Sequence, residues 1–428
     1  MRSEKLRALL DWPVRHVRPL ILGLLILLSY VAAINRTQAL PWAIAALLLA
    51  TLLSGLIWPY LLVKKLSVLR SGPTRAEEGE TISFRVEVTN HGLMPRFMVE
   101  LVDHLPFVGT AEAKTTDSNK TLGMIAYVPS KGKCQFEVPV VCEKRGHYRL
   151  GPVGLASSFP LGLAEARGQR SEGVQTLTIY PDIFTIVGLP LHGTPSQIHR
   201  GGYQLPEGAG TAEFAGLREY RRGDNPRHVH WPTTARLNDL MIKEFEPLAS
   251  ACMTIILDQS QIANIGTGKH ASFEYGVRIA GSMARFACDH NIPTRLIGQG
   301  KQLLNLASGI GAQHYQDILD TLAVIDADGE TTYAKIVERF ANECRRGETV
   351  VVFISEPAHL LPETLQALAL LRARGAHLFA MIFERQSFAP DENSAADGTE
   401  HALAALLDMN AFCMKIRQND DLVKLFNA

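Results

Sequence analysis

The chain has 428 residues, of which 46% are hydrophobic and 20% are charged, and its formal net charge is zero. This length predicts two or three domains, and the neutral balance excludes a generally basic nucleic-acid-binding protein. The six cysteines are scattered, with no CxxC pair and no histidines at zinc-site spacing. We therefore expect small buried thiols in a reducing compartment and no disulfide framework.

Two apolar segments near the N-terminus predict a membrane anchor over residues 1–65. Residues 20–34 and 39–63 carry no charge, and only residues 35–38 separate them. A helix that spans a bilayer needs about 20 residues, and thinning or snorkelling accommodates a shorter one. The short connection predicts a transmembrane helical hairpin. The alternative is a cleaved signal peptide ending near residues 31–33, which would leave the second segment as a single anchor.

Basic residues at the flanks predict the orientation of this hairpin. They precede and follow it at Arg2, Lys5, Arg7, Arg15, Arg18, Lys64, Lys65, Arg70 and Arg75. Only Arg36 lies in the connection. Because basic residues gather on the cytoplasmic side, both ends and the long remainder are expected in the cytoplasm. Aromatic side chains at Trp12, Trp42, Trp58 and Tyr60 fall near the expected interfaces.

Residues 66–185 are predicted to form an all-β, immunoglobulin-like sandwich. Residues 82–88, 98–102 and 134–141 read as short strands, with strict alternation in the first and third, and Gly, Pro and Asn residues separate such segments. The segment carries no catalytic constellation. Sandwiches of this kind serve most often as spacers or binding surfaces.

Residues 251–428 are predicted to form a doubly wound α/β domain, joined to the sandwich by a connecting segment over residues 186–250. Continuous apolar runs at 254–257, 349–354 and 377–383 predict buried parallel strands. Residues 272–290 and 361–374 have helical spacing. The alternation of strand and helix predicts a sheet with helices on both faces.

The first predicted strand of this domain leads into a candidate cation site. Asp258 and Ser260 follow it directly, at the sheet edge where ligands of open α/β sheets bind. Von Willebrand A-type domains hold a divalent cation there with an Asp-x-Ser-x-Ser loop, completed by a threonine and an aspartate. This chain has Ile262 in the third position and Ser355-Glu356 where Thr-Asp is usual. We therefore expect a weakened or absent magnesium site and no resident cofactor.

Residues 216–247 form an unusually polar segment that still alternates like an extended chain. Six basic residues lie there, at Arg218, Arg221, Arg222, Arg227, Arg236 and Lys243. Five acidic residues nearly cancel them, at Glu219, Asp224, Asp239, Glu244 and Glu246. Interleaved with Tyr220 and Trp231, the basic residues could clamp a nucleic-acid backbone. The charge balance favours internal ion pairs or a protein interface instead, with Gly223 in a turn capped by Asp224.

The same segment contains two histidines, His228 and His230, which would share one face of a strand. Such a pair could bind zinc in a metallohydrolase, but no third ligand is apparent. The favoured interpretation is a histidine pair packed around Trp231 and hydrogen-bonded to the arginines. The chain also lacks a Gly-x-Ser-x-Gly elbow and a phosphate-binding loop ending in Lys-Ser/Thr. We therefore expect a protein that is not an enzyme.

These residues carry a family resemblance. The run Arg218, Glu219, Tyr220, Arg221, Arg222, Gly223, Asp224, followed by His230, Trp231, Ala235, Arg236 and residues 243–245, resembles the signature of domain of unknown function 58. Residues 145–148, 159–163 and 180–181 agree with it. The resemblance implies a prokaryotic inner-membrane protein with a von Willebrand A-like C-terminal domain. Genes of this family commonly stand beside those of MoxR-type AAA+ ATPases, and no reaction is assigned to its members.

The resemblance also implies that the motif residues are interface or domain-joining positions. We therefore expect a membrane-anchored, non-enzymatic adaptor that binds a MoxR-type AAA+ ATPase in protein assembly or maturation. The bilayer would be its second partner, with no nucleic acid and no small-molecule substrate. The alternative is a metal-dependent adhesion-type binding module with a divalent cation at Asp258 and Ser260.

Overall fold

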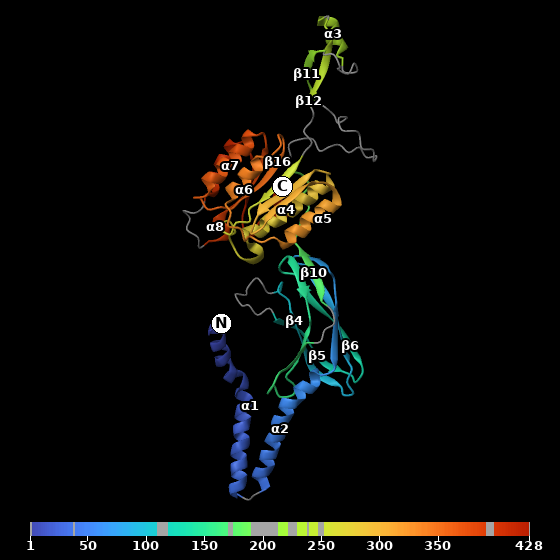
Figure 1. The fold of residues 1–428 in the computed structure, drawn as a ribbon, viewed down its shortest axis with the longest axis vertical. Helices are drawn as coiled ribbons and strands as arrows, with labels where there is room; N and C mark the ends of the chain where they lie inside the picture. Colours follow the sequence, from blue (N-terminus) through green and yellow to red (C-terminus); the bar gives the residue numbers. More distant parts are fainter. Residues whose placement is uncertain are drawn as a thin grey trace. The chain divides into compact units, whose positions relative to one another are not determined.

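A computed structural model of the chain contains two compact units, residues 1–179 and 180–428 (Figure 1). The residues that it describes are 2–36, 39–108, 119–169, 174–189, 213–220, 229–237, 239–246, 252–390 and 398–427. The first unit contains two helices and a β-sandwich. The second contains an α/β domain and a small two-stranded ribbon.

The first unit begins with two apolar helices, α1 (Arg2–Arg36) and α2 (Ala39–Val63), which lie side by side (Figure 1). The rings of Tyr30 and Trp42 meet edge to face with centroids 5.6 Å apart. Residues 17–35 and 39–63 are long and apolar enough to cross a membrane, by length and composition. Within the most apolar 18-residue stretch of each helix, only 6% and 11% of the residues are buried, whereas the core helix of a soluble domain is mostly buried. Two apolar helices are thus confirmed, and α1 starts well before residue 20.

Three sheets form the β-rich part of this unit. One has the order β1 (Leu66–Ser71), β3 (Thr81–Asn90), β6 (Lys133–Val141), and another β2 (Arg75–Glu77), β10 (Gln175–Tyr180), β7 (Gly146–Leu150). The third has the order β5 (Asn119–Val128), β4 (Arg96–His104), β8 (Gly154–Ser157), β9 (Ala166–Gln169). Alternate side chains of β3, such as Phe84 and Val86, share one core with Leu101 of β4 and Leu177 of β10. The prediction of a β-sandwich after the apolar helices is thus confirmed.

The C-terminal turns of α2 pack on this sandwich. Gly55, Pro59, Leu62 and Val63 are buried on one face of the helix, which contacts β4, β8 and β9. A hydrogen bond of 3.0 Å from Arg96 Nη2 to the carbonyl oxygen of Lys64 holds the end of the helix. Helix and sandwich therefore form one structural body without a flexible linker.

The second unit is built on a six-stranded sheet with the order β15-β14-β13-β16-β17-β18. The strands are β13 (Met253–Leu257), β14 (Thr294–Gln299), β15 (Leu303–Gly309), β16 (Thr349–Ile354), β17 (His377–Phe383) and β18 (Phe412–Ile416). All neighbours are parallel except β14 and β15, which are antiparallel. The chain leaves β13 toward one edge and returns beside it as β16, so the strand order reverses between these two strands.

Helices cover both faces of this sheet, as Figure 1 shows for α4 to α7. One core contains side chains of α4 (Ser272–Asp289), α5 (Gly311–Val324) and α10 (Leu422–Phe426). The opposite core contains those of α6 (Tyr333–Ala341), α7 (Leu361–Ala373) and α9 (Thr399–Asp408). Two short helices, η2 (Gly268–His270) and α8 (Arg385–Phe388), complete the described helices of the domain. The predicted α/β architecture is confirmed.

The segment that follows the sandwich belongs to the α/β core. Phe184 and Ile186 pack with that core, and the Phe184 ring lies 5.3 Å from that of Phe426. The backbone N–H of Phe184 donates to Ser282 Oγ at 2.9 Å. The two units divide after Ile179, whereas the sequence placed the end of the sandwich at residue 185. These apolar residues therefore pack in the core of the sheet that follows them in the chain.

The polar motif folds into a small element that we call the motif ribbon, residues 213–220, 229–237 and 239–246. Strands β11 (Glu213–Glu219) and β12 (Met241–Glu246) pair in antiparallel register, with Leu217 opposite Lys243. Between them lies the short helix α3 (Trp231–Leu237). The alternating pattern of residues 216–247 therefore comes from two strands that pair like those of a hairpin.

Candidate functional site

Polar residues, most of them buried, gather at the carboxyl ends of β13 and β16, where the strand order reverses. We call Asp258, Ser260, Thr332 and Glu356 the switch-point cluster. Asp258 directly follows β13, and Glu356 comes two residues after the end of β16. Ser260 bridges to Gly329, close to the start of α6, which Thr332 precedes. Open α/β sheets bind ligands at this position because the connections diverge there and leave a crevice.

Asp258 is the most perturbed group of the cluster. Its side chain is buried, and its Oδ1 accepts a hydrogen bond of 2.9 Å from the N–H of Ser260. Its Oδ2 is buried without a hydrogen-bond partner. Burial, and next the negative charge of Glu356, raise the pKa of Asp258 to about 7. Near neutral pH this carboxyl group is therefore divided between its charged and neutral forms.

Glu356 is the second buried acid, and it is better satisfied. Thr364 Oγ1 donates to Glu356 Oε2 at 2.5 Å, and the backbone N–H of Tyr333 also bonds the carboxylate. Burial raises the pKa of Glu356, and these hydrogen bonds oppose the shift. The hydroxyl of Tyr333 donates to the carbonyl oxygen of Ile256 at 2.7 Å and accepts from the N–H of Phe353 at 3.2 Å. Tyr333 thus ties β13 to β16 beneath both acids.

Hydroxyl groups complete the cluster. Ser260 is buried, and its Oγ accepts from the N–H of Ala263 at 3.4 Å. Thr332 Oγ1 is buried and has no hydrogen-bond partner. Sequence reasoning missed Thr332, because it sought the threonine at Ser355. The sequence feature that could have indicated Thr332 is the Thr331-Thr332 pair, which lies directly before a helical segment. Ile262 is 58% exposed, and its aliphatic side chain has no atom that could bind a cation.

The donor atoms of the cluster suit a hard cation in type. A buried carboxylate oxygen of Asp258 and a buried hydroxyl of Thr332 lack partners, and both are the oxygen ligands that Mg²⁺ prefers. Glu356 offers little to such a cation, however, since one of its carboxylate oxygens already accepts a hydrogen bond from Thr364. Among the described residues no group of three or more His, Cys, Asp or Glu side chains is placed to hold a metal. The residues fit a weakly held divalent cation that keeps several of its waters.

The motif ribbon presents Trp231 and Tyr220 to solvent. Trp231 is 67% exposed and Tyr220 is 38% exposed, and Glu219 and Arg236 are also exposed. Arg218 lies in β11 opposite Ile242. The motif residues Arg221, Arg222, Gly223 and Asp224, together with His228, lie outside the described residues.

His230 has a structural place in the ribbon. Its Nδ1 lies 2.7 Å from Thr233 Oγ1, and its backbone N–H donates to the carbonyl oxygen of Met241 at 2.8 Å. It therefore joins α3 to β12. The expectation that histidines pack around Trp231 is wrong for His230, because the indole is largely exposed. Two strands and one short helix are too small to bury so large a ring.

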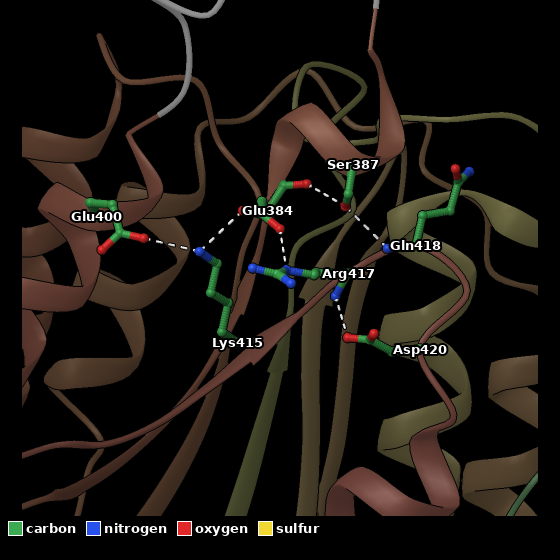
Figure 2. A network of polar contacts seen from close by, with 7 residues as sticks. All are labelled: Glu384, Ser387, Glu400, Lys415, Arg417, Gln418 and Asp420. Atoms are coloured by element: carbon green, nitrogen blue, oxygen red, sulfur yellow. Dashed lines mark hydrogen bonds and ion pairs between the residues drawn. The ribbon is translucent and has the colours of Figure 1, made fainter.

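A second polar group of residues lies at the carboxyl ends of β17 and β18, and Figure 2 shows Glu384 between Lys415 and Arg417. Lys415 Nζ lies 3.1 Å from Glu384 Oε1 and 2.9 Å from Glu400 Oε1. Arg417 Nε lies 2.5 Å from Glu384 Oε2. The hydrogen bonds of Lys415 to Glu400 and Glu384 raise its pKa. Since each charge lies beside an opposite one, this network links the end of β17 to β18 and α9.

Comparisons with known proteins bear on the second unit. Residues 216–386 match the family described as protein of unknown function DUF58, which confirms the resemblance over that segment. The uncharacterized protein YeaD of Bacillus subtilis (strain 168) is 28% identical over 144 residues. That alignment covers 32% of this chain and 33% of the relative, so the chain spans about a third of the curated relative it matches.

Two solved structures show faint likeness. The CARDB domain of PF1109 from Pyrococcus furiosus is 14% identical, with a TM-score of 0.19, over 27% of this chain and 94% of that domain. A GH20 exo-β-N-acetylglucosaminidase from Vibrio harveyi is 10% identical, with a TM-score of 0.20, over 75% of this chain and 57% of that enzyme. At such TM-scores neither likeness bears on the fold or activity of this chain.

Proposed function

We propose that this chain, with its DUF58 match over residues 216–386, is a membrane-anchored, non-enzymatic adaptor that binds a cytoplasmic protein partner. The partner proposed is an AAA+ ATPase of the MoxR type, as the family resemblance implies. The membrane is the prokaryotic inner membrane, with both ends of the helical hairpin on the cytoplasmic side.

The anchoring is supported by the surface of the two helices. Apolar side chains such as Leu24, Leu28, Leu47 and Leu53 are about half exposed or more, and would be costly to leave in water. Flanking basic residues at Arg18, Lys64 and Lys65 favour cytoplasmic ends.

The observation that carries the adaptor role is the exposure of Trp231 in the middle of the motif ribbon. Tryptophan, tyrosine and arginine dominate the energetics of protein interfaces, and Tyr220 and Arg236 are exposed on the same element. The mixed charges of the motif suit a protein surface better than a phosphate backbone. The ribbon therefore has the composition of a docking element.

The α/β domain is proposed to be von Willebrand A-like. Two features support this: the parallel sheet carries one antiparallel edge strand, β15, and its buried acid Asp258 lies where the strand order reverses. This domain directly follows the motif ribbon in the chain, and in the proposed adaptor it would serve as the scaffold that carries the ribbon.

Co-purification tests the adaptor. Tagged full-length protein is isolated from its native membrane, and captured ATPases are identified by mass spectrometry. We expect wild type to capture a MoxR-type ATPase, and Trp231→Ala to lower the yield by about tenfold or more, as for a central interface tryptophan. Leu93→Ala, which removes a 77% exposed side chain of the sandwich, is the control and should capture normally. Capture of no ATPase by wild type, or equal capture by Trp231→Ala, contradicts the proposal.

A second candidate function is a metal-dependent adhesion-type binding module at the switch-point cluster. It is favoured by the unpartnered buried atoms Asp258 Oδ2 and Thr332 Oγ1. Calorimetric titration of the full-length protein with Mg²⁺ and with Mn²⁺ tests it. Binding that disappears in Asp258→Asn supports this module, and no heat of binding with either ion rules it out.

A further inference from the structure

The loop between β8 and β9, residues 158–165, lies against α2. A Cβ atom placed on Gly55 would come within 2.5 Å of Leu163 Cδ1, so the loop touches the helix backbone where a side chain is missing. Likewise a Cβ on Gly168 of β9 would come within 2.6 Å of Val63 Cγ1. The hairpin of β8 and β9 therefore runs along the last turns of α2, with its tip beside Gly55.

The tip lies at the level where α1 leaves its apolar segment. A Cβ on Gly162 would stand 3.5 Å from Arg18 Nη1, and Arg18 is the last basic residue before the apolar part of α1. Arg18 and Gly55 are each about 26 Å from the connection between the helices at 1.5 Å per residue, and the hydrocarbon core of a bilayer is about 30 Å thick. Arg18, Gly55 and the tip therefore share one depth, near the edge of that core.

The chemistry of the tip matches this depth. Residues 158–164 read Ser-Phe-Pro-Leu-Gly-Leu-Ala and carry no charge. Leu161 is 45% exposed, and Pro160 is exposed beside it. The first charged pair, Glu165 with Arg167 at 2.8 Å, comes only after the tip. An apolar tip next to a basic side chain is the pattern of elements that rest in the headgroup and acyl boundary.

We propose that loop 158–164 is a third membrane contact of this chain, with Leu161 and Pro160 seated in the headgroup and acyl boundary of the cytoplasmic leaflet. Arg18 stands beside it at the level of the lipid phosphates. This inference rests on the proposed anchoring by α1 and α2. Because α2 packs directly on the sandwich, the third contact fixes the tilt of the sandwich on the bilayer surface.

Depth-dependent fluorescence quenching tests this contact. A fluorescent amino acid replaces Leu161 in the full-length protein, which is reconstituted into phosphatidylcholine and phosphatidylglycerol vesicles with lipids spin-labelled near the headgroup. The control probe replaces Val141, which is 43% exposed and pairs with Thr81 at the end of β3 far from α2. A probe at Tyr60 in α2 reports the anchor, and one at Pro160 guards against local misfolding at position 161.

We expect quenching at 161 and 160 to be at least twofold stronger than at 141 and similar to that at 60. Quenching at 161 and 160 no stronger than at 141, with strong quenching at 60, overturns the loop contact and leaves the anchor intact. Weak quenching at all four positions overturns the anchor and the loop contact together.

Discussion

The motif ribbon and the switch-point cluster are two polar regions of the same unit, and they differ most in burial. Trp231 of the ribbon is 67% exposed, whereas Asp258 of the cluster is 6% exposed. An exposed indole can bind a partner without altering its own chemistry. A buried carboxyl group has its pKa raised to about 7, so its chemistry changes while its access is restricted. Under the proposed function, partner recognition and altered side-chain chemistry are thus separated between the two regions.

The largest effect on stability is expected from Asp258→Asn. In the fold the pKa of Asp258 is raised to about 7 from its ordinary 3.8. Between these values the unfolded chain has released a proton that the fold retains, so the free energy of unfolding falls as pH rises through this window and levels off above it. The amide cannot ionise, so the variant should be more stable than wild type at pH 8 by about 4 kcal/mol, the free-energy equivalent of a pKa raised from 3.8 to about 7.

Hydrogen exchange of peptides from β13 and β16, followed by mass spectrometry at pH 5 and pH 8, measures this difference, because exchange reports the local free energy of opening. The control is Asp239→Asn, since Asp239 is exposed. Equal pH dependence in wild type and Asp258→Asn would show that the buried carboxyl group is not perturbed.

Tyr333→Phe should have the next largest effect. The hydroxyl of Tyr333 is buried and bonds backbone groups of Ile256 and Phe353, so its removal leaves two buried polar groups unpaired. We expect the free energy of unfolding of the α/β domain to fall by about 1 to 2 kcal/mol. Urea denaturation measures it, with Tyr127→Phe as the exposed control. An unchanged midpoint would mean that the tyrosine does not tie the two strands.

Lys415→Met should lower stability by less than about 1 kcal/mol, because partly exposed ion pairs contribute little. Its two carboxylate partners, Glu384 and Glu400, can be screened by salt. The difference from wild type should therefore shrink between low and high salt in the same urea experiment. A larger difference in stability that does not respond to salt would mean that these ion pairs behave as buried ones, like the groups of the switch-point cluster.

Trp231→Ala should leave the stability of the α/β domain unchanged within about 0.5 kcal/mol, as is usual for a surface substitution. The expectation follows from the exposure of the indole and from its place on a separate two-stranded element. Thermal unfolding of the full-length variant checks it. A clear loss of stability would mean that the indole packs on the domain and is not free to bind a partner.

Sequence patterns predicted the buried parts of the fold well. The apolar runs of β16 and β17 were placed at their observed bounds, because strands buried on both faces have few polar residues. Strand β15 was missed, since it is an edge strand with a half-exposed, mixed sequence. The division after Ile179 was also missed, because an apolar segment does not reveal which core it joins.

Of the candidate sites, Asp258 and Ser260 were found from their place after a strand. Thr332 was not, because only the fold brings the start of α6 to the same edge of the sheet. The exposure of Trp231 was predicted wrongly. An aromatic residue among charged ones gives the same sequence pattern whether its ring is buried or exposed. Local pattern thus predicts elements, whereas burial depends on the size of the body to which an element belongs.

The most direct test of the adaptor compares both regions in one capture experiment. Full-length wild type, Trp231→Ala and Asp258→Asn are purified in parallel from the native membrane, and the captured AAA+ ATPase is quantified. The adaptor predicts that Trp231→Ala loses the ATPase and Asp258→Asn retains it. Loss in Asp258→Asn with full capture by Trp231→Ala would contradict the adaptor and assign partner binding to the switch-point cluster.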